Sequence, residues 1–123
     1  MATLNLTESA FEETVLQKGI VFVDFWAEWC GPCRMFGPVF EAASEKNPDI
    51  VFAKVDTEAE QGIAAAAGIS SIPTLMAFRD GVLLFRESGA LPAEPFAQLI
   101  QAIRDVDMKE VRKDIAKEES EGN

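Results

Sequence analysis

The residues best suited to chemistry are Cys30 and Cys33, the only two cysteines in the chain. They lie in the segment WCGPC, between a run of apolar residues and a segment with helical periodicity. Residues three positions apart share one face of a helix, so the two sulfur atoms can form a disulfide. Unpaired amides and the positive end of the helix dipole favour a thiolate at Cys30. We therefore expect Cys30 to be exposed and to attack disulfides, and Cys33 to resolve the mixed disulfide.

Two other interpretations of the cysteine pair are open. A zinc site needs four ligands, and a chain without histidine or a third cysteine would have to complete it with two carboxylates. A structural disulfide across so short a loop would stabilise the fold by only about 2 kcal/mol on a chain-entropy model. The absence of histidine also removes the commonest general base and the Cys–His and Ser–His catalytic pairs. Redox chemistry is the interpretation that these observations favour.

Asp24 is the single charged residue in the segment IVFVDFWA, which spans Ile20 to Ala27. Its β-branched and aromatic neighbours are typical of a strand covered on both faces, which would bury the carboxyl and raise its pKa. A buried carboxyl beneath the disulfide could accept the proton of Cys33 as that thiol attacks. On an edge strand, Asp24 would point to solvent instead. Lys54, in the segment AKVD, could pair with Asp24 or extend its ammonium group to water.

Hydrophobic periodicity predicts the elements that position these residues. The first half contains a strand at Leu4 to Leu6, a helix capped by Thr7 that ends near Lys18, a central strand at 20–27, and a helix at 31–46 that includes Pro38. The second half contains a strand at 50–56, a helix at 57–67 closed by Gly68, two strands joined by Arg79-Asp80-Gly81, and a helix from about Pro92. The Asp-Gly turn predicts an antiparallel hairpin.

The stretch after Arg104 is charged, and its apolar residues change register. One helical stripe contains Phe96, Leu99, Ile100, Ile103 and Val106, and a second contains Met108, Val111 and Ile115. Asp107 and Glu110 have the spacing of a capping box, so we expect a bend and a second short helix from about Met108 to Lys117. The alternative is a frayed charged helix with a disordered end.

Composition excludes several classes of function. With 48% hydrophobic and 26% charged residues, the 123-residue chain is ordinary for a globular protein with one core. No apolar run reaches the length of about 18 residues that a membrane span requires. The net charge of −10 repels phosphate backbones, so no nucleic-acid partner is expected. The first twenty residues lack the features of a secretory signal, and we therefore expect a cytoplasmic protein.

Five short motifs occur in an order that resembles the thioredoxin family: DFWAEWCGPCR, AKVD, GISSIPT, FRDG and SGA. The resemblance covers about residues 3 to 104. We therefore divide the chain into a thioredoxin-like domain, residues 1–104, and a charged helical C-terminal extension, residues 105–123. The resemblance implies an α/β thioredoxin fold, in which a single central mixed five-stranded sheet is flanked by helices.

The resemblance also implies site residues. Cys30 and Cys33 resemble the redox-active pair, and Asp24 and Lys54 resemble a buried acid and its lysine partner. Pro73 resembles a cis proline that faces the disulfide. The residues that resemble an apolar groove for an extended client segment are Trp29, Gly31, Pro32, Ile72, Pro73, Gly89 and Ala90.

The function that the resemblance implies is protein-disulfide reduction by a monomer that needs no bound metal or cofactor and is recharged by an NADPH-dependent thioredoxin reductase. Gly31-Pro32 matches general reductants, because relatives that form or isomerise disulfides place a histidine beside the second cysteine. A cationic ring there would make the disulfide more oxidising. Ser88 and Ala67 depart from the family pattern and leave the client preference open. The alternative class is a non-catalytic binding or holdase subunit that uses the same groove.

Overall fold

The computed structural model of the chain describes residues 2–121, and its centre is a five-stranded sheet of order β1-β3-β2-β4-β5. The strands are β1 (Thr3–Asn5), β2 (Ile20–Trp26), β3 (Val51–Asp56), β4 (Thr74–Arg79) and β5 (Val82–Ser88). The helices are α1 (Glu8–Leu16), α2 (Gly31–Lys46), α3 (Gln61–Ala66), α4 (Ala93–Asp105) and α5 (Met108–Glu121). β1 and β2 run parallel to β3, whereas β4 is antiparallel to β2 and β5. The mixed sheet with β2 at its centre confirms the sequence-based prediction.

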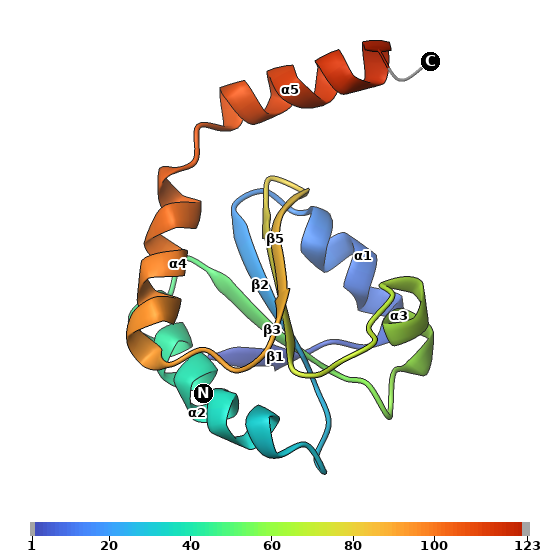
Figure 1. Cartoon of the computed structure of the whole chain (residues 1–123), viewed down its shortest axis with the longest axis vertical. Coiled ribbons are helices and arrows are strands. Elements are labelled where there is room, and N and C mark those ends of the chain that lie inside the picture. Colours follow the sequence, from blue (N-terminus) through green and yellow to red (C-terminus); the bar gives the residue numbers. More distant parts are fainter. Residues whose placement is uncertain (1, 122–123) are drawn as a thin grey trace.

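Each face of the sheet packs against a different pair of helices, α2 and α4 on one side and α1 and α3 on the other (Figure 1). Phe22 of β2 belongs to a cluster with Phe36 of α2 and Phe96 of α4. Val23, the next residue, belongs to a second cluster that includes Ile63 of α3. Successive side chains of a strand point to opposite faces, so β2 contributes alternately to both halves of the core.

The predicted helices at 31–46 and from Pro92 are confirmed, but the first helix differs at both ends. α1 ends at Leu16 rather than near Lys18. Thr7 occupies the N-cap position, yet its side chain makes no capping hydrogen bond. Its hydroxyl lies 3.2 Å from the hydroxyl of Ser9 instead.

The helix predicted at 57–67 is shorter, because a side chain holds its first residues in a turn. Asp56 Oδ1 accepts hydrogen bonds from the backbone N–H groups of Glu58, at 2.9 Å, and Ala59, at 3.3 Å. This arrangement competes with helical hydrogen bonding, and α3 begins only at Gln61. The predicted glycine cap is confirmed, since Gly68 has a φ of +65° directly after the helix.

The turn between β4 and β5 lies at the end of the sheet where β2 begins. Asp80 and Gly81 both have positive φ, 52° and 81°, as a two-residue hairpin loop requires. Two hydrogen bonds join Asp80 to Gly19. The Asp80 N–H donates to the Gly19 carbonyl oxygen at 2.9 Å, and the Gly19 N–H donates to Asp80 Oδ1 at 2.8 Å. The predicted hairpin is therefore confirmed, and it closes the end of the sheet opposite to the end where Cys30 follows β2.

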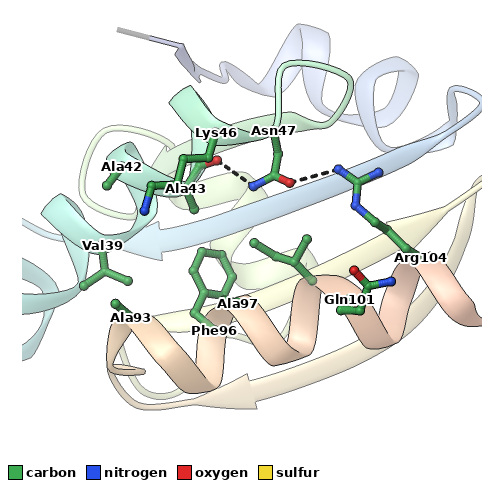
Figure 2. Close-up of a pocket in the computed structure, with 11 residues that line it drawn as sticks. Val39, Ala42, Ala43, Lys46, Asn47, Ala93, Phe96, Ala97, Gln101 and Arg104 are labelled. Atoms are coloured by element: carbon green, nitrogen blue, oxygen red, sulfur yellow. Dashed lines mark hydrogen bonds between the residues drawn. The ribbon is translucent and has the colours of Figure 1, made fainter.

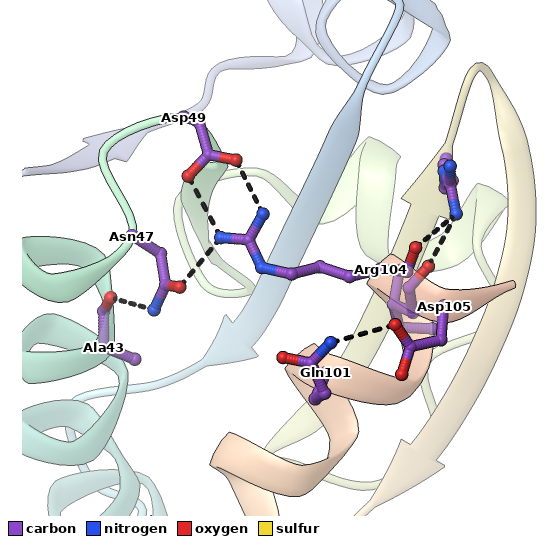
Figure 3. Close-up of polar contacts among 8 residues, drawn as sticks. Ala43, Asn47, Asp49, Gln101, Arg104 and Asp105 are labelled. Carbon is purple, nitrogen blue, oxygen red and sulfur yellow. Dashed lines mark hydrogen bonds and ion pairs between the residues drawn. The ribbon is translucent and has the colours of Figure 1, made fainter.

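α2 and α4 cross with small side chains at their interface and leave a hollow of about 180 Å³ (Figure 2). Ala43 and Ala97 line it, with Phe96 between the helices. Arg104 closes one end of this helix pair by pairing with Asp49 at 2.7 Å and donating to Asn47 Oδ1 at 2.9 Å (Figure 3). These contacts fix the end of α4 against the loop between α2 and β3.

The junction between α4 and α5 is held by Arg79 of the hairpin. Its Nη1 donates to the carbonyl oxygens of Ile103 and Arg104, both at 3.0 Å, and of Val106, at 2.8 Å. The last carbonyls of α4 would otherwise lack helical partners. Asp107 Oδ1 then accepts the N–H groups of residues 109 and 110, which confirms the predicted bend and cap.

α5 is longer than predicted and projects from the body of the protein (Figure 1). Met108 at its start is buried, whereas Val111 and Ile115 are half-buried. Arg112 lies 3.9 Å from Asp80 of the hairpin turn. Residues 118–121 of the predicted disordered end are helical, and residues 122 and 123 lie outside the described residues. Within residues 2–121, none of the helices is long and apolar enough to cross a membrane.

Candidate active site

Cys30 and Cys33 lie where β2 gives way to α2, and they form a disulfide with a Cα–Cα distance of 5.2 Å. Cys30 is the N-cap residue of α2 and Cys33 belongs to its first turn. The backbone N–H of Cys33 donates to Cys30 Sγ at 3.2 Å. Pro32 occupies the start of the helix, where the missing N–H costs nothing. A reduced Cys30 at this position has an amide donor that would stabilise its thiolate.

The prediction that Cys30 is exposed is wrong. Cys30 and Cys33 are 4% and 5% exposed, so accessibility does not distinguish them. The reason is that Trp26 and Ile72 pack against the pair. Cys30 Sγ lies 3.6 Å from the carbonyl oxygen of Ile72, so the segment before Pro73 covers the sulfur of Cys30 at the start of α2. Helix position and the amide contact, rather than exposure, distinguish Cys30 from Cys33.

The segment that covers the disulfide turns at Pro73. The Ile72-Pro73 peptide bond is cis, as the sequence predicts. Pro73 itself is buried, and its carbonyl oxygen accepts the N–H of Gly89 at 2.8 Å. This bond connects the loop that faces Cys30 to the residue after β5. The backbone around the cis proline is therefore held between the disulfide, through Ile72, and the end of β5, through Gly89.

Asp24 is fully buried on the face of the sheet that α2 and α4 cover. Within the described part of the chain, neither of its carboxylate oxygens has a hydrogen-bond partner. Burial raises the pKa of Asp24 from an ordinary 3.8 to about 7, and the positive charge of Lys54 opposes part of this rise. The predicted burial is confirmed, and the alternative of a solvent-facing Asp24 is wrong.

Lys54 lies beside Asp24 in the register of β2 and β3. Its charge acts on the carboxyl through space, since the Asp24 oxygens have no hydrogen-bond partner within residues 2–121. The ammonium Nζ lies over the ring of Trp26, 4.9 Å from the ring centroid. The indole Nε1 of Trp26 is buried and has no hydrogen-bond partner among residues 2–121. The carboxyl, the lysine and the indole thus occupy one partly desolvated region at the end of β2.

A hollow of about 320 Å³ lies beside the disulfide and is lined by Trp29, Thr57, Ile69, Ser70, Ser71 and Ile72. Trp29 is 67% exposed, and its Nε1 donates to Glu58 Oε1 at 2.7 Å. Gly31 and Pro32 are exposed at the start of α2. The structure thus brings Trp29 and Ile72 together, as the predicted groove requires.

Gly89 and Ala90, also predicted for that groove, line a separate hollow of about 120 Å³ with Leu75. Gly89 approaches the first hollow only through its bond to Pro73. The sequence prediction missed Ser71 and Ile69 as lining residues. Their position in GISSIPT, directly before Ile72-Pro73, was the available signal. It also missed Glu58, which nothing in the sequence connects with Trp29.

A metal site was an open alternative for the cysteines. Within residues 2–121, no group of three or more histidine, cysteine, aspartate and glutamate side chains is placed to hold a metal ion. Cys30 and Cys33 are bonded to one another instead.

The sequence model of the thioredoxin family matches residues 2–102. The chain belongs to the thioredoxin family. It is 52% identical over 120 residues to a protein named putative thioredoxin 2 from Streptomyces coelicolor, covering 98% of this chain and 90% of that protein. It is 42% identical over 97 residues to thioredoxin 1 of Synechococcus elongatus, covering 77% of this chain and 91% of the relative.

A solved structure confirms the thioredoxin fold. The thioredoxin of Malassezia sympodialis, Mala s 13, matches with a TM-score of 0.73 and 34% sequence identity, over 82% of this chain and 93% of that one. Family membership together with the Cys30–Cys33 pair identifies a dithiol-disulfide oxidoreductase that reduces protein disulfides. The thioredoxin matches end near residue 102 in the family model, whereas the Streptomyces match runs through most of α5.

Replacing Asp24 should change how stability depends on pH. The folded-state pKa of about 7 lies above the unfolded value, so the unfolded chain releases this proton first as pH rises. The free energy of unfolding therefore falls between about pH 4 and pH 7. We expect Asp24→Asn to be more stable than the parent by about 1–3 kcal/mol at pH 8, the scale of an unmet buried polar group. Urea unfolding at pH 4 and pH 8 measures the difference.

The matched control is Asp49→Asn. A hydrogen bond from Arg104 lowers the pKa of this exposed carboxyl, so its removal should give no gain at pH 8. A gain for Asp24→Asn of equal size at both pH values would contradict the assignment to titration.

Proposed function

We propose that this thioredoxin reduces client disulfides through Cys30 as the nucleophile and Cys33 as the resolving thiol. The observation that carries the proposal is the position of Cys30, which caps α2 and receives the Cys33 amide on its sulfur. A thiolate gains more from that amide and from the helix dipole than a thiol does. Cys33 lies within the first turn and has its own amide directed at the other sulfur.

The reaction balances in two exchanges. The Cys30 thiolate attacks one sulfur of the client disulfide, which forms a Cys30–client mixed disulfide and releases the other client sulfur as a thiolate that takes up a proton. Cys33 then loses its proton and attacks Cys30 Sγ, which releases the second client thiol. Two electrons and two protons pass to the client, and the Cys30–Cys33 disulfide is left oxidised.

Asp24 is proposed as the acceptor of the Cys33 proton. Its support is a buried carboxyl with a pKa near 7, on the sheet face that α2 covers. A general base works best when its pKa lies close to the operating pH. Lys54 is proposed to stabilise the ionised carboxylate of Asp24, since its positive charge opposes the rise in the pKa of Asp24.

The client is proposed to lie as an extended segment across Trp29, Gly31, Pro32, Ile72, Pro73, Gly89 and Ala90. Support comes from the exposed indole, the hollow between Trp29 and Ile72, and the backbone near the cis proline. We further propose that an NADPH-dependent thioredoxin reductase restores the dithiol, that no bound cofactor takes part, and that the protein acts in the cytoplasm as a monomer.

Substitution of the two cysteines should separate their roles. Cys30→Ser should abolish reduction of a protein disulfide, because no first nucleophile remains. Cys33→Ser should accumulate a covalent complex with the client through Cys30, because the second exchange cannot occur. NADPH oxidation with purified thioredoxin reductase and non-reducing electrophoresis provide the two measurements.

A parallel assay with dithiothreitol as the electron source distinguishes failure of the exchange from failure to be recharged. Faster alkylation of Cys33 than of Cys30 in the reduced native protein would show that the roles are reversed. Full reductase activity of Cys30→Ser would contradict the assignment of the nucleophile, and a parent protein without reductase activity in either assay would favour the holdase alternative.

Asp24→Asn should also slow turnover, by about tenfold or more near neutral pH, because Cys33 loses its proton acceptor. The defect should shrink at high pH, where hydroxide and solvent remove the proton. Initial rates of disulfide reduction from pH 6 to pH 9 give the profile, and the mixed disulfide should persist longer in rapid-quench samples. Identical profiles for variant and parent would count against the role.

The redox chemistry is proposed to reside in residues 1–104, and residues 105–123 to be a separate extension. The match to the family model ends at residue 102, and α5 lies at the hairpin end of the sheet, opposite to the disulfide. Truncation after Asp105 should leave reduction of a generic protein disulfide within about twofold of the full chain. A truncated protein that is folded by circular dichroism but has lost most of this activity would place α5 at the active site.

A further inference from the structure

Three hydroxyl groups next to the cis proline form a continuous hydrogen-bonded chain. Ser71 Oγ donates to Ser88 Oγ at 2.8 Å, and Ser88 Oγ lies 3.1 Å from Thr74 Oγ1. Thr74 Oγ1 in turn donates to the carbonyl oxygen of Ser71 at 2.5 Å. We call these residues, Ser71, Thr74 and Ser88, the hydroxyl clasp.

The number of hydroxyl protons fixes the direction of the hydrogen bonds in the clasp. Each hydroxyl has one proton to donate. Thr74 gives its proton to the Ser71 carbonyl, so between Ser88 and Thr74 the donor must be Ser88. The order is therefore Ser71 to Ser88 to Thr74, and then back to the Ser71 backbone. All three protons are used within the clasp.

The clasp lies at the border of the proposed client surface. Ser71 lines the hollow that contains Trp29 and Ile72. Ser88 pairs with Thr74 in the register of β4 and β5, and the residue after it donates to Pro73. Thr74 is buried, whereas Ser71 and Ser88 are exposed. The chain of hydroxyls thus leads from buried backbone to an exposed oxygen beside the disulfide.

The group that the clasp presents to a client is an acceptor. The Ser71 hydroxyl proton is already bonded, while its oxygen accepts no hydrogen bond within residues 2–121. A hydroxyl oxygen has two acceptor lone pairs. A client group that donates a hydrogen bond would therefore bind the Ser71 oxygen. A client group that accepts one would face a lone pair of that oxygen and be repelled, unless the clasp opened.

We propose that the hydroxyl clasp determines specificity among disulfide clients, by favouring segments with a hydrogen-bond-donor side chain beside the reacting cysteine. The proposal rests on the proposed client surface. Ser71 supplies the contact, and Ser88 acts as a positioning residue because it holds the Ser71 proton away from the client. An apolar client side chain at the same place would exclude water from the Ser71 oxygen and leave that oxygen without a hydrogen-bond partner, which weakens binding.

The experiment uses the reduced full-length protein and two mixed disulfides between glutathione and an extended peptide. The two peptides are identical except that one has Asn and the other Leu next to the cysteine. The pair is made twice, with the varied residue first before and then after the cysteine. Asn and Leu have similar shapes, and neither carries charge. The measured quantity is the Asn-to-Leu ratio of kcat/KM, with kcat and KM determined separately.

For the parent protein the ratio should exceed one by about two- to tenfold on one side of the cysteine, the range of one neutral hydrogen bond. Ser71→Ala should bring the ratio close to one, mainly through KM. Ser88→Ala should lower it partially, because the released Ser71 hydroxyl can then donate as well as accept. Ser9→Ala is the matched control, since it breaks an exposed hydroxyl pair with Thr7 far from the disulfide and should keep the parent ratio.

A parent ratio of one on both sides, or the same ratio in Ser71→Ala and the parent, would overturn the inference. An equal loss for both peptides in Ser71→Ala, with kcat affected as much as KM, would also overturn it and assign the clasp a structural role only. A parent protein that reduces a protein disulfide but neither peptide would also overturn the inference, whereas a parent protein that reduces neither peptide nor a protein disulfide would refute the proposed function.

Discussion

The structure depends on the complete covering of β2, the central strand, on both of its faces. Its side chains alternate between two hydrophobic clusters, one under α2 and α4 and the other under α1 and α3. A carboxyl in such a strand has no access to solvent, and Asp24 therefore keeps its proton to about pH 7. The same strand leads, through residues 27–29, to Cys30 at the cap of α2. The acid and the disulfide are thus positioned by one element, whose location is fixed by the apolar area that it buries.

Two backbone groups contact the sulfur of Cys30. The Cys33 amide is oriented by the start of α2, and the Ile72 carbonyl by the loop that turns at the cis peptide bond. Backbone groups keep their direction when side chains change, which suits a site where disulfides are exchanged. Side chains such as Trp29 and Ser71 line the hollow that lies next to these groups.

Much of this arrangement could be predicted from local patterns, and the parts that could not depend on contacts between distant residues. The uninterrupted apolar run around Asp24 was sufficient to predict a central strand, and Asp80-Gly81 to predict the hairpin. The burial of Cys30 depends on Ile72, which is 42 residues away in sequence. The hydroxyl clasp joins Ser71 and Ser88, which are 17 residues apart, and nothing in the sequence distinguishes either serine from an ordinary surface-loop serine. The start of α3 depended on a side-chain hydrogen bond of Asp56, which competes with helix formation and has no periodic signature.

Without histidine in the chain, Asp24 is a side chain whose raised pKa brings its change of charge close to neutral pH. Histidine is the side chain that ordinarily gains or loses charge between pH 5 and 8, and this chain has none. In the oxidised protein the cysteines do not titrate, whereas burial raises the pKa of Asp24 to about 7. The charge at the centre of the sheet therefore changes within the pH range of living cells.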